Sequence, residues 1–165
     1  MNFMEKKITV VTGERGAGKS TYCLNRVEKA RKENRIVRGI LSPAVYHADR
    51  KTGFYTRDLA TDVQLLTGSV TAEPGLTERF YRWYLNPAAI TWGNQILTEI
   101  DSCDLLIIDE IGPLEFKEQR GFTAAFSCLR SATYQEALVV LRPECLPDFN
   151  ALGFAFNTHE IIKGE

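Results

Sequence analysis

The chain has 165 residues and a net charge of -1, from 20 basic and 21 acidic side chains. This length fits one domain over residues 1–165 with a substantial core, and the balanced charge argues against a general nucleic-acid binder. No apolar run approaches the ~18 residues that span a membrane, and no signal-peptide core follows the mixed N-terminal segment.

The first half of the chain alternates short apolar runs with one amphipathic segment. The expected elements are a buried strand at 7–12, a helix at 20–33, a strand at 36–41, a hairpin at 45–59 with its turn at 51–53, a strand at 63–67 that extends the hairpin, and a loop at 68–75. Apolar β-branched runs predict the strands, and helical spacing of Tyr22, Leu24 and Val27 predicts the helix.

The second half opens with a helix signal, because Asn86 is a good N-cap and Pro87 suits the first helical position. The expected elements are a helix from 86 to about 100, a strand at 104–108, a loop at 112–113, a helix at 121–132, a strand at 137–141, a short turn or helix limited by Pro143 and Pro147, and a last strand at 154–162. Continuously apolar strands that alternate with helices predict a mostly parallel α/β sheet covered on both faces, with the hairpin as an antiparallel insertion or edge.

Residues 13–20 read Gly-Glu-Arg-Gly-Ala-Gly-Lys-Ser and match the phosphate-loop pattern GxxxxGK followed by Ser or Thr. A predicted strand precedes the loop and a helix follows it, as that pattern requires. The glycines let consecutive backbone N–H groups wrap a phosphate, and the helix presents the positive end of its dipole. The predicted nucleotide-binding residues are Gly13, Glu14, Arg15, Gly16, Ala17, Gly18, Lys19, Ser20 and Thr21.

Within this loop, Lys19 is expected to reach the β- and γ-phosphates and act in catalysis. The Ser20 hydroxyl is expected to ligate Mg²⁺, and Thr21 to add a secondary polar contact. The loop therefore predicts a site for ATP, GTP or another nucleoside triphosphate, with Mg²⁺ as cofactor.

An acidic pair follows the most hydrophobic strand, in the run DLLIIDE. Asp109 fits the aspartate that holds Mg²⁺ at the carboxyl end of a strand neighbouring the phosphate loop. Glu110 is the candidate general base, because a carboxylate there can orient and deprotonate an attacking water. This favours hydrolysis over transfer to a substrate oxygen. Glu115 is a further candidate for lining the site.

An arginine often neutralises the charge that develops on the γ-phosphate. Arg15 lies inside the loop, and Arg142 follows a strand at its carboxyl end, where sites of open α/β sheets form. Each is a candidate for this catalytic role or a solvated surface arginine. If neither serves, turnover is slow or a partner supplies the arginine.

Five segments together resemble the small P-loop nucleoside-triphosphatase family of thermophiles and other prokaryotes. They are VVTGERGAGKST at 10–21, RGILSP at 38–43, KTGFYTRDL at 51–59, LLIIDEIGPLEF at 105–116 and VVLRP at 139–143. The resemblance implies a three-layer, RecA-like P-loop fold and slow, Mg²⁺-dependent hydrolysis of nucleoside triphosphates with little base selectivity. By position, the resemblance implies that residues 13–20 bind the nucleotide, that Asp109 is the metal carboxylate and that Glu110 is the carboxylate that acts on water.

Two features depart from that family pattern. Lys51 stands where the family often has arginine, which leaves the role of this position open. The family usually continues past the last strand with a helix containing Asn and Arg, which the sequence to Glu165 lacks. The aromatic segment at 80–84 is also distinctive, and predicts either partly buried packing or a surface for base stacking or a partner.

Four widely spaced cysteines show no metal-binding spacing, and predict reduced thiols, three of them in the core, of a cytoplasmic protein. They are Cys23, Cys103, Cys128 and Cys145. Zinc binding has no support in the sequence. Hydrolysis is the first functional hypothesis. The alternatives are a nucleoside, nucleotide or small-metabolite kinase, with its acceptor under residues 45–67, and a nucleotide-gated module that binds a protein partner.

Overall fold

Strands rich in Val, Ile and Leu form the parallel part of one mixed sheet in the computed structural model, which describes residues 6–163. The strand order is β10-β1-β9-β8-β2-β4-β5-β7-β6, and β3 pairs with β4. The elements are β1 Lys7–Thr12, α1 Lys19–Lys32, β2 Val37–Leu41, β3 Ala44–His47, β4 Arg50–Asp58, β5 Gln64–Ser69, β6 Glu78–Phe80, β7 Trp83–Leu85, α2 Pro87–Thr98, β8 Leu105–Ile108, α3 Pro113–Glu118, α4 Ala124–Ser131, β9 Glu136–Val140, the 3-10 turn η1 Pro143–Cys145, α5 Leu146–Asn150 and β10 Asn157–Glu160.

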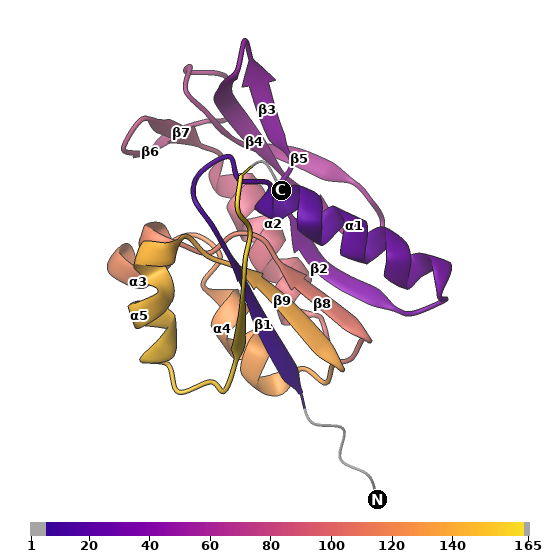
Figure 1. Ribbon diagram of the computed structural model, residues 1–165. Helices are drawn as coiled ribbons and strands as arrows, with labels where there is room; N and C mark the ends of the chain where they lie inside the picture. Colours follow the sequence, from indigo (N-terminus) through magenta and orange to yellow (C-terminus); the bar gives the residue numbers. More distant parts are fainter. Residues whose placement is uncertain (1–5, 164–165) are drawn as a thin grey trace, which may run out of the picture.

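Helices cover both faces of the parallel strands and divide the core in two (Figure 1). On one face, Cys23, Val27 and Ala30 of α1 pack with buried side chains of the sheet such as Ile107. On the other face, α2, α4 and α5 cover a larger cluster that includes Phe149. Alternate residues of each strand enter opposite clusters, because successive strand side chains point to opposite faces. The predicted three-layer α/β fold is confirmed.

The order of the parallel strands differs in one respect from the expectation. The strand that carries Asp109 was expected beside the strand that leads into the phosphate loop. Instead β9 lies between them, because it pairs in parallel with both β1 and β8. The carboxyl ends of all three strands still meet at one edge of the sheet, which is where the loop and the acidic pair lie.

An antiparallel extension continues the sheet beyond β2, through β4, β5, β7 and β6. The predicted hairpin exists, but its turn is not at residues 51–53. These residues belong to β4, and the chain reverses at Ala48 and Asp49, which both have positive φ, at 48° and 58°. Two consecutive residues of this kind give a tight turn whose twist suits a hairpin. Gly68 and Ser69, expected in a loop, extend β5 instead.

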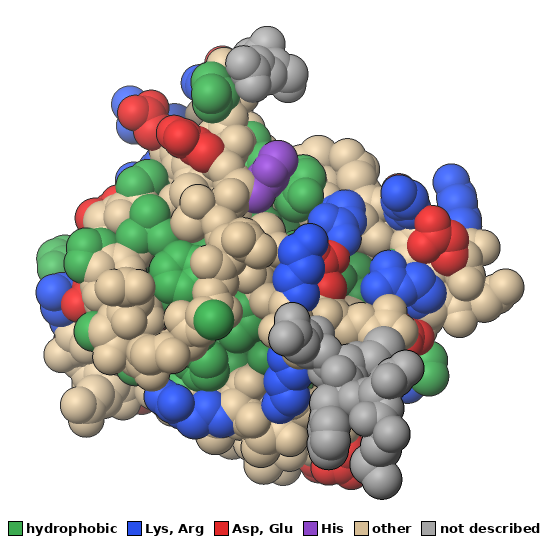
Figure 2. All heavy atoms as spheres, turned by 60° about the horizontal axis from the view of Figure 1, so that its bottom comes forward, with side chains coloured by type: hydrophobic (Ala, Val, Ile, Leu, Met, Phe, Trp, Pro, Cys, Tyr) green, Lys and Arg blue, Asp and Glu red, His purple; other side chains and the backbone are tan. Residues whose placement is uncertain are grey.

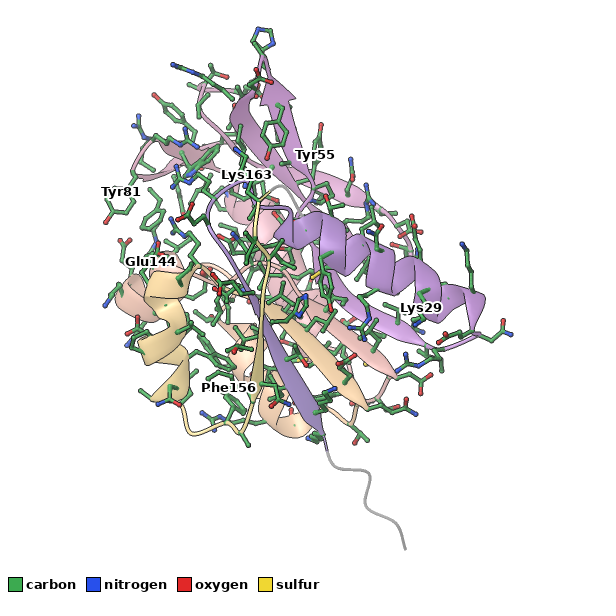
Figure 3. The ribbon with its side chains drawn as sticks, in the orientation of Figure 1. Lys29, Tyr55, Tyr81, Glu144, Phe156 and Lys163 are labelled. Atoms are coloured by element: carbon green, nitrogen blue, oxygen red, sulfur yellow. The ribbon has the colours of Figure 1, made fainter. Side chains whose placement is uncertain are left out.

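The aromatic segment at residues 80–84 forms most of a second small hairpin, between β6 and β7. The sequence did not predict these strands, because each has only three residues. Its turn includes Tyr81, which is 81% exposed. Figure 3 shows Tyr81 at the outer end of this hairpin, pointing away from the body of the protein.

The predicted start of α2 is confirmed in detail. The Asn86 side chain accepts hydrogen bonds from the N–H groups of Ala88 and Ala89, at 3.0 and 3.4 Å. Its amide also donates to the carbonyl of Leu66 at 3.0 Å, which ties the helix start to β5. Pro87 occupies the first turn, where its missing N–H costs no hydrogen bond.

Most of the later predictions are right in type and differ in their limits, but the loop predicted at residues 112–113 is wrong, because Gly112 caps the helix α3 and Pro113 begins it. The helix expected from residue 121 begins at Ala124, and α3 was missed because Gly112-Pro113 suggested a loop. The last strand is only Asn157–Glu160. Phe154 and Phe156, expected in that strand, pack their rings against Phe149 instead.

The edge where the parallel strands begin comes forward in Figure 2, and its surface mixes Lys and Arg with Asp and Glu. One such group joins Glu136 to both Lys7 and Arg26. Across residues 6–163, no helix has the length and apolar character needed to cross a membrane.

Replacement of the Asn86 cap tests the account of α2. Asn86→Ala is expected to lower the free energy of unfolding by about 1–2 kcal/mol, because two N–H groups lose their acceptor. Urea denaturation measures this change. The control is Asn25→Ala on the exposed side of α1, which should change stability by less than about 0.5 kcal/mol. Equal stability of the two variants would contradict the account.

Candidate nucleotide site

The loop between β1 and α1 has the backbone geometry of a phosphate cradle. Gly18 caps α1 with φ 104°, a left-handed value that favours glycine. Gly13 approaches the chain after β10 so closely that a Cβ atom there would lie 2.5 Å from the carbonyl oxygen of Ile161. The loop lies above the carboxyl end of β1 (Figure 1), so the first N–H groups of α1 face the same edge of the sheet.

Lys19 is buried at the start of α1 and folds back over the loop. Its ammonium group donates hydrogen bonds to the carbonyl oxygens of Gly13 and Glu14, at 2.7 and 3.0 Å. Burial lowers the pKa of Lys19 from its ordinary value, while the charges of Glu110 and Asp109 act in the opposite direction. The ammonium is therefore held at the rim of the cradle, next to two carboxylates.

Asp109 follows directly after β8 and is 1% exposed. Its Oδ2 accepts hydrogen bonds from the Ser20 hydroxyl at 2.8 Å and from the Ser42 N–H at 3.0 Å. Its Oδ1 is buried and has no hydrogen-bond partner within the described part of the chain. Burial raises the pKa of Asp109 to about 6, the Glu110 charge adds to this, and the two hydrogen bonds oppose it.

Glu110 lies beside this pair but is more open, with 37% of its side chain exposed. Its Oε1 lies 4.0 Å from Nε of Arg142, which also lies 3.5 Å from Oε1 of Glu144. Arg142 follows β9 and is shared between the two carboxylates. The ends of β8 and β9 thus place an acid and a cation at the mouth of the cradle.

These groups open into one cavity of about 260 Å³. Of the residues predicted for the site, those that line the cavity are Arg15, Gly16, Gly18, Lys19, Ser20, Asp109, Glu110 and Arg142. Gly13, Glu14, Ala17 and Thr21 do not line it. The structure therefore brings the phosphate loop, the acidic pair and both candidate arginines to one cavity.

Glu115 also lies at the wall of this cavity, but its carboxylate is occupied by the backbone. Oε1 accepts from the Gly112 N–H at 2.8 Å, and Oε2 accepts from the Phe122 N–H at 2.9 Å. Burial raises the pKa of Glu115 to about 7, against the effect of these hydrogen bonds. Glu115 therefore connects the start of α3 to the segment before α4 and stabilises the fold there.

Several lining residues were not assigned to the site from the sequence. Ser42 donates its backbone N–H to Asp109. The sequence could have indicated this, because Ser42 follows β2 directly, at the sheet edge where Asp109 also lies. Lys51, Phe54 and Trp83 come from the antiparallel extension. Lys51 had been noted through its place in a family segment, and Trp83 as part of the aromatic segment at residues 80–84. Neither was assigned to the cavity, because no local pattern tells that these strands line the same cavity as the phosphate loop.

Comparison with known proteins agrees with this geometry. The sequence profile of the NTPase family matches residues 8–143. The chain belongs to this NTPase family. The predicted resemblance and the enzyme class, a nucleoside triphosphatase that hydrolyses nucleoside triphosphates, are thereby confirmed.

Two curated relatives in the NTPase family are nucleoside-triphosphatase THEP1 of Methanosarcina acetivorans and of Ignicoccus hospitalis. The first is 33% identical over 123 residues, which cover 73% of this chain and 69% of the relative. The second is 36% identical over 107 residues, covering 65% of this chain and 60% of the relative. The aligned part thus spans about two thirds of the length of these relatives.

Two solved structures share the fold at 18% sequence identity. The solution structure of a human cancer-related nucleoside triphosphatase has a TM-score of 0.70, covering 96% of this chain and 90% of that one. The crystal structure of THEP1 from the hyperthermophile Aquifex aeolicus has a TM-score of 0.64, with 94% and 90% covered. Both support the P-loop fold.

The raised pKa of Glu115 predicts a pH dependence of stability. The pKa rises from 4.5 to about 7 on folding, so the folded protein binds this proton more tightly than the unfolded chain. The stabilisation is complete below pH 4.5 and is lost as pH rises to 7, by about 3 kcal/mol at 1.36 kcal/mol per unit. Urea denaturation between pH 5 and 8 measures it.

Glu115→Gln should remove the Glu115 part of this slope, between about pH 6 and 7, and leave the part below about pH 6 that the raised pKa of Asp109 contributes. It should also lower stability by about 1–3 kcal/mol, because an amide can accept from only one of the two N–H groups. Glu118→Gln, on the exposed side of α3, is the matched control and should keep the slope. A slope between pH 6 and 7 that is unchanged in Glu115→Gln would show that another group causes it.

Proposed function

We propose that the protein hydrolyses nucleoside 5′-triphosphates to diphosphate and phosphate with Mg²⁺, using the site at Gly13–Ser20, Asp109 and Glu110. The observation that carries this proposal is the 2.8 Å hydrogen bond between Ser20 and Asp109, with Glu110 beside it. It joins the phosphate loop to an acidic pair in one cavity. Family membership supports the same activity.

The triphosphate binds along the loop, where backbone N–H groups of residues 13–20 and the Thr21 side chain meet its oxygens. Lys19 exchanges the carbonyls of Gly13 and Glu14 for the β- and γ-phosphates, because phosphate oxygens are stronger acceptors than neutral carbonyls. The positive end of α1 adds to this attraction.

Ser20 and Asp109 suit a Mg²⁺ site. Asp109 offers a buried Oδ1 without a partner, next to a serine hydroxyl. Within residues 6–163, no group of three or more His, Cys, Asp or Glu side chains forms a metal cage, and Mg²⁺ commonly uses one or two carboxylates with substrate phosphates and water. Ser20 and Asp109 would hold a bound Mg²⁺ at the phosphate loop, where it would neutralise negative charge that develops on the phosphate oxygens.

Glu110 acts as the general base. It orients a water molecule in line with the γ-phosphorus and accepts its proton as the new P–O bond forms and the bond to the bridging β–γ oxygen breaks. Its partial exposure suits this role, because water has access to its carboxylate. Lys19 and Arg142 face the γ-phosphate oxygens and stabilise their charge.

Turnover is slow and base selectivity is broad, as the family resemblance implies. Arg142 is divided between Glu110 and Glu144, and Arg15 is exposed in the loop. Neither is held in the rigid two-point geometry that makes an arginine most effective. The four buried, unpaired cysteines suit a reducing compartment, so we place the protein in the cytoplasm.

A small-metabolite kinase is a second candidate, because the cavity continues past the acidic pair toward Phe54 and Trp83. A kinase would release little phosphate until its acceptor is added. Phosphate release with nucleoside triphosphate and Mg²⁺ alone therefore separates the two candidates.

Removal of the proposed base gives the sharpest test of hydrolysis. Glu110→Gln should keep the affinity for nucleoside triphosphate and lose about 10²- to 10⁴-fold of the turnover, because only proton acceptance is removed. Glu144→Gln is the matched control, since it removes the other carboxylate near Arg142 and should change turnover little. Normal phosphate release by Glu110→Gln would exclude Glu110 as the base.

Removal of the proposed metal carboxylate tests the role of Asp109. Asp109→Asn should raise the Mg²⁺ concentration for half-maximal turnover by about 10- to 100-fold. Asp101→Asn, on an exposed residue before β8, should leave the Mg²⁺ titration unchanged. An unchanged titration in Asp109→Asn would place the metal elsewhere.

A further inference from the structure

The cavity reaches well beyond the phosphate loop and the acidic pair. Its lining includes three aromatic side chains of the antiparallel extension, Phe54 of β4, Phe80 of β6 and Trp83 of β7, which together are called the aromatic wall. The rings of Phe54 and Trp83 lie 5.2 Å apart in an edge-to-face arrangement, which fixes this wall. Stacking against aromatic rings is a common way of holding a planar ligand ring.

Two cations accompany this aromatic wall. The Lys51 ammonium lies 5.3 Å from the ring centre of Phe54 and 5.9 Å from that of Trp83. The Arg82 guanidinium lies 4.5 Å from the Trp83 ring centre. No hydrogen bond or ion pair of either charged group occurs within residues 6–163, whereas nearby Arg120 pairs with Glu78. These cations are available to a ligand anion.

The aromatic part of the cavity lies at the γ-phosphate end of the proposed nucleotide. Lys19, Ser20, Asp109 and Glu110 define that end, and all of them line the cavity. The nucleoside lies at the opposite end of the triphosphate chain. Thr21 and Tyr22, which follow the loop on α1, are not part of the cavity wall. In this placement, the base of the bound triphosphate lies away from Phe54 and Trp83.

We propose that Phe54, Trp83, Lys51 and Arg82 form a second ligand subsite, next to the γ-phosphate, for a small planar-ring anion of the size of a nucleoside monophosphate. The ring stacks on the aromatic wall, and the phosphate or carboxylate of the ligand meets Lys51 and Arg82. This inference rests on the proposed position of the triphosphate. It requires that both ligands bind at the same time.

The test is ternary binding to the full chain. The chain has two tryptophans, so Trp92→Phe, which lies outside the cavity wall, leaves Trp83 as the single fluorescent reporter. The protein is saturated with Mg²⁺ and the non-hydrolysable β,γ-imido analogue of ATP, and AMP is added. Benzoate tests a carboxylate as the anion, while adenosine and inorganic phosphate test the ring and the anion alone.

The subsite predicts that AMP changes Trp83 fluorescence without displacing the ATP analogue, and that adenosine and phosphate bind much more weakly. If benzoate also changes the fluorescence, Lys51 and Arg82 accept a carboxylate as well as a phosphate. Phe54→Leu and Arg82→Ala should each weaken AMP binding about tenfold or more. The matched controls Tyr55→Leu and Arg79→Ala, whose side chains lie outside this cavity wall, should not.

Binding of the ATP analogue by each variant shows that the fold and the phosphate site are intact. Displacement of the ATP analogue by AMP, no binding of AMP or benzoate, or equal affinity in the Phe54 and Tyr55 variants would overturn the subsite. Failure of the wild type to release phosphate from ATP would instead overturn the proposed function. The two failures are thus distinguishable.

Discussion

The hydrogen bond between Ser20 and Asp109 joins the two parts of the chain on which the site depends. Ser20 is the last residue of the phosphate loop and lies in the first turn of α1, and Asp109 follows directly after β8, 89 positions later in the sequence. Strand β9 separates β8 from β1, yet the carboxyl ends of parallel strands share one edge, so the two side chains meet above it. This contact places a metal-binding oxygen beside the phosphate cradle and sets Glu110 at its open side.

The antiparallel extension adds what the parallel strands lack. Parallel strands can bring a phosphate loop and acids together at their ends, but they leave that edge open. The strands after β2 supply a wall of aromatic rings and cations at one side of the same cavity. This aromatic side of the site has the chemistry for a second ligand. In this account, the parallel strands hold the groups that act on the phosphates, and the antiparallel extension holds the groups that select a second ligand.

The sequence predicted the features that local physical rules determine. The apolar runs located β1 and β8, the capping preferences of Asn86 and Pro87 located α2, and the glycine spacing located the phosphate loop. It placed the hairpin turn three residues late, because Lys51-Thr52-Gly53 resembles a turn, whereas Ala48 and Asp49 carry no such signal. Strand order and the position of Trp83 at the site depend on pairing between strands that are far apart in the sequence. The local sequence of one segment does not show which strand it will pair with. For the same reason, the sequence could not tell that Lys51 faces the cavity.

The central claim is that water, held at Glu110, attacks the γ-phosphorus of a triphosphate bound by this loop. Turnover of ATP with Mg²⁺ in water enriched in ¹⁸O, followed by mass analysis of both products, tests it most directly. The account predicts one oxygen from water in each inorganic phosphate released and none in the diphosphate. Label in the diphosphate, or a phosphorylated metabolite in place of free phosphate, would contradict it.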